Sequence, residues 1–205
     1  MLRIRQATFS DLELILRFID EASRWLHDKG TDQWAQPWPN RAERDERVRS
    51  GLVDGRTWMV DDEQGEAIAT VTGRPDGNPL LWTLPEQVEP AVYVSRLIVG
   101  RAYSGRAIGD ELLNWAGNRA RQHYGARWIR IDVWTTNDAL HDYYRKRGFE
   151  FVRQRQDVDY PSAMLFQRPT APLRSESWLQ ELPARQARSR MPAPAGITGA
   201  VAASP

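Results

Sequence analysis

The chain has 205 residues, of which 41% are hydrophobic, including nine Trp, so it can bury the core of one domain with at most an appendage. This composition excludes an intrinsically disordered protein. The 28 basic residues almost balance the 27 acidic ones, for a net charge of +1. That balance gives no reason to expect nucleic acid or an anionic membrane as the main partner.

Cysteine is absent from the sequence, which excludes disulfides, a thiol nucleophile and a cysteine zinc site. His27, His123 and His141 are scattered without the spacing of metal ligands, so no metal is expected. The sequence has no apolar run long enough to cross a bilayer, and its N-terminus lacks the features of a signal peptide. We therefore expect a cytoplasmic protein.

The first elements are an edge strand over residues 2–7 and a helix over 10–27. The helix begins with SDLE, the pattern of a capping box. Besides its core stripe it carries a second apolar line, Leu14, Phe18 and Trp25. This line is expected to border a substrate pocket or a partner surface.

Residues 29–40, KGTDQWAQPWPN, predict a loop. Trp34 and Trp38 in this loop either wall a substrate pocket or pack the loop onto the core. The strongly charged helix over 41–52 is predicted to be a solvated face.

A hairpin is predicted next, with strands over 57–60 and 67–72, followed by an irregular loop over 73–90. Three loop residues are candidates to reach a substrate site: Trp82, Glu86 and Glu89.

Residues 91–109, AVYVSRLIVGRAYSGRAIG, lead from a buried strand through small and basic residues into a helix that runs to about Tyr124. The unpaired N–H groups at the helix start, together with the helix dipole, form an anion site, most often for phosphate. Arg101 and Arg106 would add charge-assisted hydrogen bonds. Neither the Gly-Lys-Ser/Thr loop of nucleoside triphosphate sites nor the three-glycine dinucleotide fingerprint occurs here.

A strand is predicted over 128–134 and a helix over 137–147, which ends at Gly148. Final strands are expected over 149–155 and 163–166. From about residue 169 the composition shifts to Pro, Ala, Ser, Arg and Gly. We therefore expect a domain over 1–168 and a disordered tail over 169–205, in which 175–182 form at most one or two helical turns.

Two segments together resemble the GNAT superfamily of N-acetyltransferases. SGRAIG at 104–109 resembles its acyl-CoA loop, which reads Arg or Gln, two residues, Gly, one residue, then Gly or Ala. Ser104 stands where Arg or Gln is usual, and Ala107, where Gly is usual, is a mild change if its φ is negative. NDALHDYYRKRGF at 137–149 is similar to a second family segment, with Asn137, Tyr144, Gly148 and Phe149 at the family spacing.

The resemblance implies an α/β (α+β) fold: a mixed, mostly antiparallel sheet of about seven strands, flanked by helices and splayed between strands 93–99 and 128–133. It implies acetyl transfer from acetyl-CoA, a co-substrate, to a primary amine by direct attack in a ternary complex. The CoA-binding residues that it implies are Leu97, Ile98, Val99, Arg101, Ser104, Gly105, Arg106, Ala107, Ile108, Gly109, Asn137 and Tyr144.

Tyr144 is the predicted catalytic acid, because a phenol is protonated at neutral pH and can protonate the leaving thiolate. Its alternative is packing in the helix interface. Asn137 either hydrogen-bonds the CoA chain or caps its helix. Asp132 ranks first as the base, ahead of Glu89 and Tyr93; its alternative is a salt bridge with Arg130 or a cap for the following turn.

The predicted acceptor-binding residues are Trp25, Trp34, Trp38, Trp82 and Tyr93. An enclosed aromatic pocket favours a small amine such as an antibiotic, a polyamine or an amino acid. Two alternatives remain: acetylation of a protein at its N-terminus or a lysine, and a non-catalytic acyl-CoA-binding module. A homodimer is left open.

Overall fold

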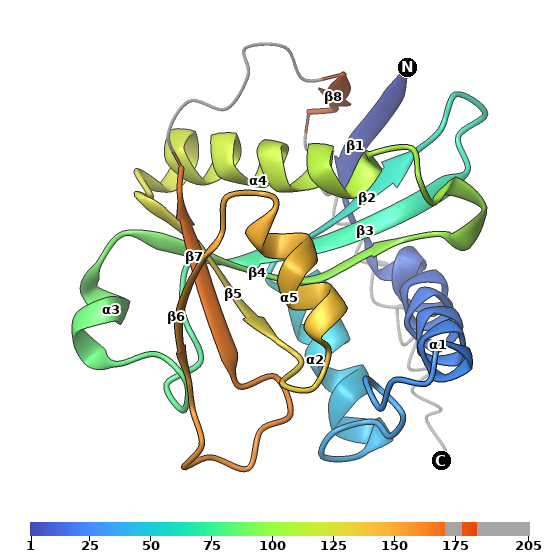
Figure 1. Ribbon diagram of the computed structural model, residues 1–205. Coiled ribbons are helices and arrows are strands. Elements are labelled where there is room, and N and C mark those ends of the chain that lie inside the picture. The colour runs from blue at the N-terminus through green and yellow to red at the C-terminus, as the bar shows by residue number, and fades with distance from the viewer. Residues whose placement is uncertain (171–177, 184–205) are drawn as a thin grey trace, which may run out of the picture.

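The computed structural model describes residues 1–170 and 178–183, whose strands form one eight-stranded sheet in the order β6-β7-β5-β4-β3-β2-β1-β8 (Figure 1). The strands are β1 (Leu2–Gln6), β2 (Thr57–Asp61), β3 (Ala67–Arg74), β4 (Ala91–Val99), β5 (Trp128–Val133), β6 (Glu150–Gln154), β7 (Met164–Pro169) and β8 (Leu179–Glu181). The helices are α1 (Leu12–Asp28), α2 (Arg41–Val53), α3 (Leu84–Val88), α4 (Ile108–Tyr124) and α5 (Asp138–Arg145), with 3₁₀ turns η1 (Phe9–Asp11) and η2 (Arg101–Tyr103).

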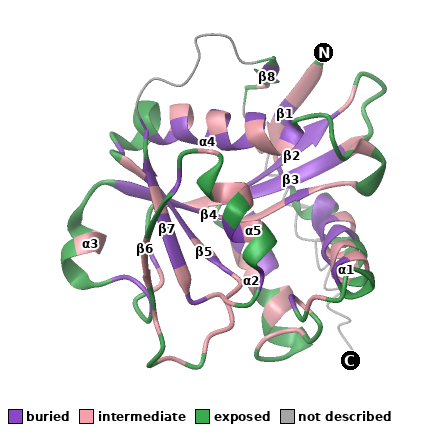
Figure 2. Ribbon diagram, in the orientation of Figure 1, coloured by how far each residue is buried: buried purple, intermediate pink, exposed green. Residues whose placement is uncertain are grey.

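Most neighbouring strands are antiparallel, but β4–β5 and β1–β8 are parallel. Because side chains alternate along a strand, each face of the sheet has its own core. Trp58 and Val60 pack with α4, whereas Met59 packs with residues of α1 and α2. The buried residues accordingly lie on the central strands and the inward sides of the helices (Figure 2). The mixed, mostly antiparallel sheet predicted from the sequence is confirmed, with eight strands instead of about seven.

The feature that positions the site is the separation of β4 from β5. The two strands pair only over Ala91–Trp128, Val92–Ile129 and Tyr93–Arg130. Beyond these pairs they diverge, and α5 lies over the gap (Figure 1). The rest of β4, residues 94–99, therefore keeps one edge that β5 does not cover, as the predicted splay requires.

The structure corrects the expectation that 2–7 form an edge strand and that 175–182 form helical turns. β8 pairs with β1 in parallel, and Leu179 is buried in the core against α4. Trp115 Nε1 donates to Glu181 Oε2 at 2.9 Å. These contacts stabilise a strand too short for its composition to reveal. The rest of the predicted tail, 171–177 and 184–205, lies outside the described residues.

Three local predictions also need correction. The capping box is formed by Thr8 and Asp11, because Asp11 Oδ2 accepts from Thr8 N at 2.7 Å, and α1 begins at Leu12 instead of following a box that starts at Ser10. Phe18, expected on the second apolar line, is buried in the α1–α2 core. The loop predicted over 73–90 contains the short helix α3, which is capped by Thr83 and Glu86.

Candidate active site

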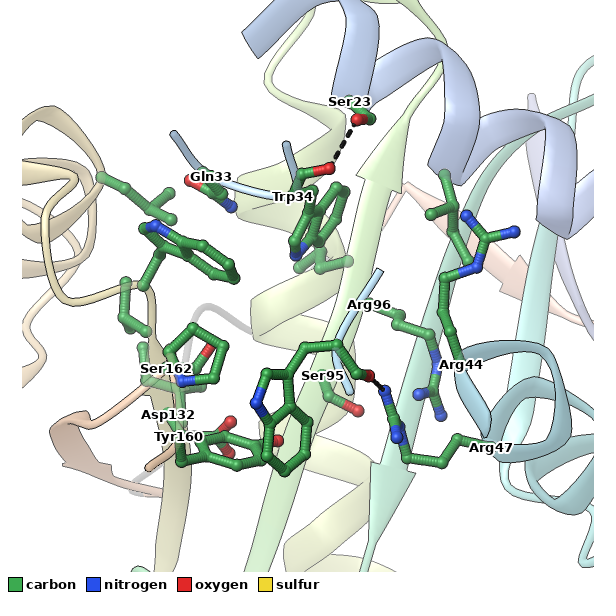
Figure 3. A pocket seen from close by; sticks show the side chains of 18 of the residues that line it. Ser23, Gln33, Trp34, Arg44, Arg47, Ser95, Arg96, Asp132, Tyr160 and Ser162 are labelled. Carbon is green, nitrogen blue, oxygen red and sulfur yellow. Dashed lines mark hydrogen bonds between the residues drawn. The ribbon is translucent and has the colours of Figure 1, made fainter. Parts of the chain in front are cut away.

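A cavity of about 240 Å³ lies where β4 and β5 part (Figure 3). Its floor comes from residues 94–97 of β4, from 131–133 at the end of β5 and from Trp134, which follows that strand. Its walls come from α1, the loop over 29–40, α2, α5 and residues 160–162. The candidate base Asp132 and the candidate acid Tyr144 both line this cavity.

Asp132 lies on the opposite face of β5 from Ile131 and Val133, which are core residues. Removal of its carboxylate from water raises the pKa of Asp132 from 3.8 to about 6, although the charge of Arg96 acts in the opposite direction. Among the described residues, Asp132 forms no ion pair. Arg130, the predicted partner, is instead paired with Glu89. Asp132 thus combines a pKa of about 6 with a place in the cavity lining, which are two properties that a candidate general base needs.

Arg130 organises a buried cluster away from the cavity, and this cluster accounts for several predicted site residues. Its guanidinium donates to Glu89 and, at 3.1 Å, to the Tyr93 hydroxyl, and it lies 5.1 Å from the centre of the Trp82 ring. Glu86 pairs with Arg153, which lowers the pKa of that carboxyl to about 2. Trp82, Tyr93, Glu86 and Glu89 thus stabilise the fold instead of lining the cavity, because a buried arginine needs partners.

Tyr144 reaches the cavity from α5, with its ring 5.4 Å from that of Phe149 and 5.2 Å from that of Tyr143. Within the described part of the chain, its hydroxyl has no hydrogen-bond partner. Burial raises the pKa of Tyr144 above its ordinary value, so the phenol is protonated at neutral pH. The neighbouring Tyr143 is different, since it donates to Asp110 at 3.2 Å and is a structural residue.

Asn137 is engaged at both ends of its side chain. Its Oδ1 accepts from Leu140 N at 3.0 Å, which caps α5, and its Nδ2 donates to Gln33 Oε1 at 2.5 Å. The helix-capping alternative therefore describes the structure. The contact with Gln33 also ties the loop that walls the cavity to α5.

The segment between β4 and α4 has the backbone geometry of an anion site. Gly105 has φ +78° and Ala107 has φ 56°, both left-handed, and α4 starts without a side-chain cap. The N–H groups of its first turn are thus available to a phosphate, with Arg101 and Arg106 in the same segment. Ala107 was expected to be a mild change if its φ were negative, and this condition is not met. The left-handed backbone gives a physical reason why glycine is usual at this position.

Two of the remaining aromatic residues are at the cavity and one is not. Trp34 and Trp38 line it, and the Trp38 ring packs edge-on against that of Tyr160 at 4.7 Å. Trp25 is not part of the cavity lining. Its ring is covered by the guanidinium of Arg101, which lies 3.8 Å from the ring centre. Its position beside Arg101 places it near the segment between β4 and α4 instead of at the cavity.

Sequence reasoning missed three arginines of the cavity: Arg44, Arg47 and Arg96. Arg96 projects from a β-bulge in β4, where the register shifts opposite 70–72 and its own φ is 46°. Arg44 and Arg47 lie on α2, the helix predicted to be a solvated face. The sequence did contain a signal for Arg44. Arg44, Val48 and Gly51 recur at helical intervals, which places Arg44 on the same side of α2 as the buried Val48 and Gly51.

The described residues contain no group of three or more metal-ligating side chains and no helix that meets the length and apolarity of a membrane span.

Comparisons with known proteins agree with this geometry. The model of the Acetyltransferase (GNAT) family matches residues 19–149. The chain is 27% identical over 148 residues to the "Uncharacterized N-acetyltransferase YesJ" of Bacillus subtilis (strain 168), covering 71% of this chain and 80% of that protein.

Solved structures show the same fold. One is an acetyltransferase of the GNAT family from Listeria monocytogenes 4b F2365, with a TM-score of 0.68 and 21% identity over 82% of this chain and 94% of that one. Another is the PaiA N-acetyltransferase from Thermoplasma acidophilum in complex with coenzyme A, with a TM-score of 0.59 and 18% identity over 82% and 99%. The match to the family model confirms the resemblance carried by segments 104–109 and 137–149, and the solved structures confirm the fold.

Proposed function

Because the chain belongs to the acetyltransferase (GNAT) family and is thus an acyltransferase, we propose that it moves an acetyl group from acetyl-CoA to the primary amine of a small molecule. The proposed route is direct attack of the amine within a ternary complex. The observation that carries the proposal is that Asp132 and Tyr144 line one small cavity at the point where β4 and β5 part.

The residues around this point fit an acyl-CoA. The uncovered edge of β4 beyond Tyr93 has main-chain groups that suit the amides of the pantetheine arm, as in the addition of a strand. The left-handed turn at Gly105 and Ala107, with the uncapped start of α4, suits the pyrophosphate. When bound, acetyl-CoA supplies the activated acyl group.

The proposed catalytic steps use two side chains. Asp132 takes a proton from the ammonium of the acceptor, and the amine nitrogen then forms a bond to the acetyl carbon as the carbon–sulfur bond breaks. Tyr144 gives its proton to the departing sulfur, and the second proton lost by the amine replaces it. A backbone N–H near Leu97 or Ile98 stabilises the oxyanion, an interaction worth about 3 kcal/mol in comparable sites.

The cavity favours a small acceptor over a protein segment. Its volume of about 240 Å³ is limited, and the rings of Trp34, Trp38 and Tyr160 form its walls. Direct attack is favoured because the chain has no cysteine to carry the acetyl group. The serines at the cavity, Ser23, Ser95 and Ser162, have no histidine beside them in the lining.

The experiment is to incubate the full chain with acetyl-CoA and a panel of primary amines, to follow free thiol, and to identify products by mass spectrometry. Thiol release that depends on an amine, with the acetylated amine as product, supports the proposal. A Tyr144→Phe variant serves as the site control. The proposal is overturned if acetyl-CoA fails to bind in a calorimeter, or if none of the amines in the panel causes thiol to be released.

A further inference from the structure

Of the arginines that line the cavity, only one has carboxylate partners among the residues that the structure describes. Arg44 is paired with Asp20 and with Asp45, each at 2.7 Å. Arg47 donates to the Trp38 carbonyl, but within the described chain no carboxylate lies within 4.0 Å of it. Two guanidinium groups, those of Arg47 and Arg96, therefore face the cavity without a counter-charge in contact.

Arg96 is the more unusual of the two. Its Nη2 is buried and has no hydrogen-bond partner among the described residues. The guanidinium lies against α2, since a Cβ added at Gly51 would be 3.5 Å from Nη2. Burial, with the nearby charges of Arg74 and Arg47, lowers the pKa of Arg96 to about 10, which leaves it charged at neutral pH. A charged guanidinium with a buried nitrogen that has no partner is destabilising unless an anion satisfies it.

The two signs of charge lie on different sides of the cavity. Arg44, Arg47 and Arg96 gather on one side in Figure 3, and Asp132 lies with Tyr160 on the other. A ligand with an ammonium group near Asp132 and an anionic group near Arg96 would satisfy both sides at once. A ligand with the ammonium alone would leave the arginines unpaired.

From this arrangement we propose that the acceptor is an amino acid or a similar amine with a carboxylate, which Arg96 and Arg47 bind while Asp132 faces the amine. This inference rests on the proposed acetyltransferase function and narrows it to one substrate class. Arginine suits the role, because its planar fork pairs with both oxygens of a carboxylate. Polyamines and uncharged aromatic amines are then poor acceptors.

The test compares the standard amino acids with their α-carboxamides as acceptors, with acetyl-CoA saturating. For at least one pair we expect kcat/KM to favour the carboxylate by about 100-fold or more, because a site built for a polar group rejects the analogue that lacks it. Arg96→Gln should abolish this preference by lowering only the value for the carboxylate. Arg96→Lys should restore part of it, and Arg47→Gln gives a second variant should Arg96→Gln not fold.

Arg49→Gln is the matched control, because Arg49 lies on α2 outside the cavity lining and pairs with Glu46. It should keep the full preference. Equal rates for acids and carboxamides, faster acetylation of amines without a carboxylate, or an undiminished preference in Arg96→Gln would overturn the inference while the acetyltransferase function stands.

A calorimetric titration with the N-acetyl derivatives of the same amino acids separates the two failures. If no amine is acetylated, the proposed function fails, and the carboxylate subsite is judged by this titration alone. Binding that is lost in Arg96→Gln supports the subsite. Absence of binding, or equal binding by both proteins, refutes it.

Discussion

Replacement of Asp132 by asparagine should increase the stability of the protein at high pH while it lowers the activity. The carboxylate of Asp132 is held where Arg96, Tyr144 and Tyr160 face it, and burial dominates over the attraction of Arg96. The folded state raises the pKa from 3.8 to about 6. Folded protein therefore binds this proton more tightly than the unfolded chain, and stability from this group is lost as pH rises between these values.

The size of the effect follows from the two pKa values. A difference of about 2 units corresponds to about 3 kcal/mol above pH 6, and partial exposure reduces this to about 2 kcal/mol. An asparagine side chain has no charge to desolvate, so Asp132→Asn should raise the free energy of unfolding by about 2 kcal/mol at pH 8 and by about 0.5 kcal/mol or less at pH 4. For a chain of this size, the melting temperature at pH 8 should rise by roughly 4–8 °C.

The assay is urea denaturation and thermal unfolding at pH 4, 6 and 8, together with the pH profile of kcat/KM. The acidic limb near pH 6 should disappear in the variant, and kcat/KM at neutral pH should fall about 100-fold or more. Asp157→Asn is the control, because Arg155 lowers the pKa of that exposed carboxyl and its removal should give no stabilisation. A variant no more stable than the wild type at pH 8 would refute the assigned environment of Asp132, and an unaltered acidic limb would refute its role.

Three further predictions address other parts of the structure. Tyr144→Phe should lower kcat about 100-fold with less than about a threefold change in KM for acetyl-CoA, whereas Tyr143→Phe should leave kcat nearly unchanged; equal kinetics of both variants would remove the acid role. Ala107→Gly should raise the free energy of unfolding by about 0.5–1 kcal/mol in guanidinium titrations, because it relieves a left-handed alanine, and a decrease would argue against that backbone conformation. Leu179→Ala should lower the same quantity by about 2–4 kcal/mol, and a loss below about 0.5 kcal/mol would show that β8 contributes little to the sheet.

Local patterns were sufficient for most of the elements. The alternation in 128–133 and the turn at Gly148, with φ +77°, depend only on neighbouring residues and are found where the sequence predicted them. The segments at 104–109 and 137–149 could be recognised in the same way, because their motifs consist of residues close together in the sequence. Asp132 and Tyr144, which line the cavity, lie in such segments, whereas Trp34 and Trp38 reach it from the loop over 29–40.

The misses have a common physical origin in long-range contacts. Trp82 and Tyr93 were predicted at the acceptor site, but a single buried arginine, Arg130, draws both into another cluster. Arg96 was not singled out, because only the bulge in β4 turns it toward α2. β8 was missed because its stability comes from β1, at the opposite end of the chain, and not from its own three residues.

The separation of β4 from β5 also bears on how an enzyme of this kind can change. Under the proposed function, the donor is recognised largely through peptide groups along residues 94–99, which substitutions leave in place. The acceptor meets side chains from α2 and the loop over 29–40 instead, and each of these can be exchanged individually. Evolution can thus retune the choice of amine one substitution at a time while the hold on the shared acyl donor persists.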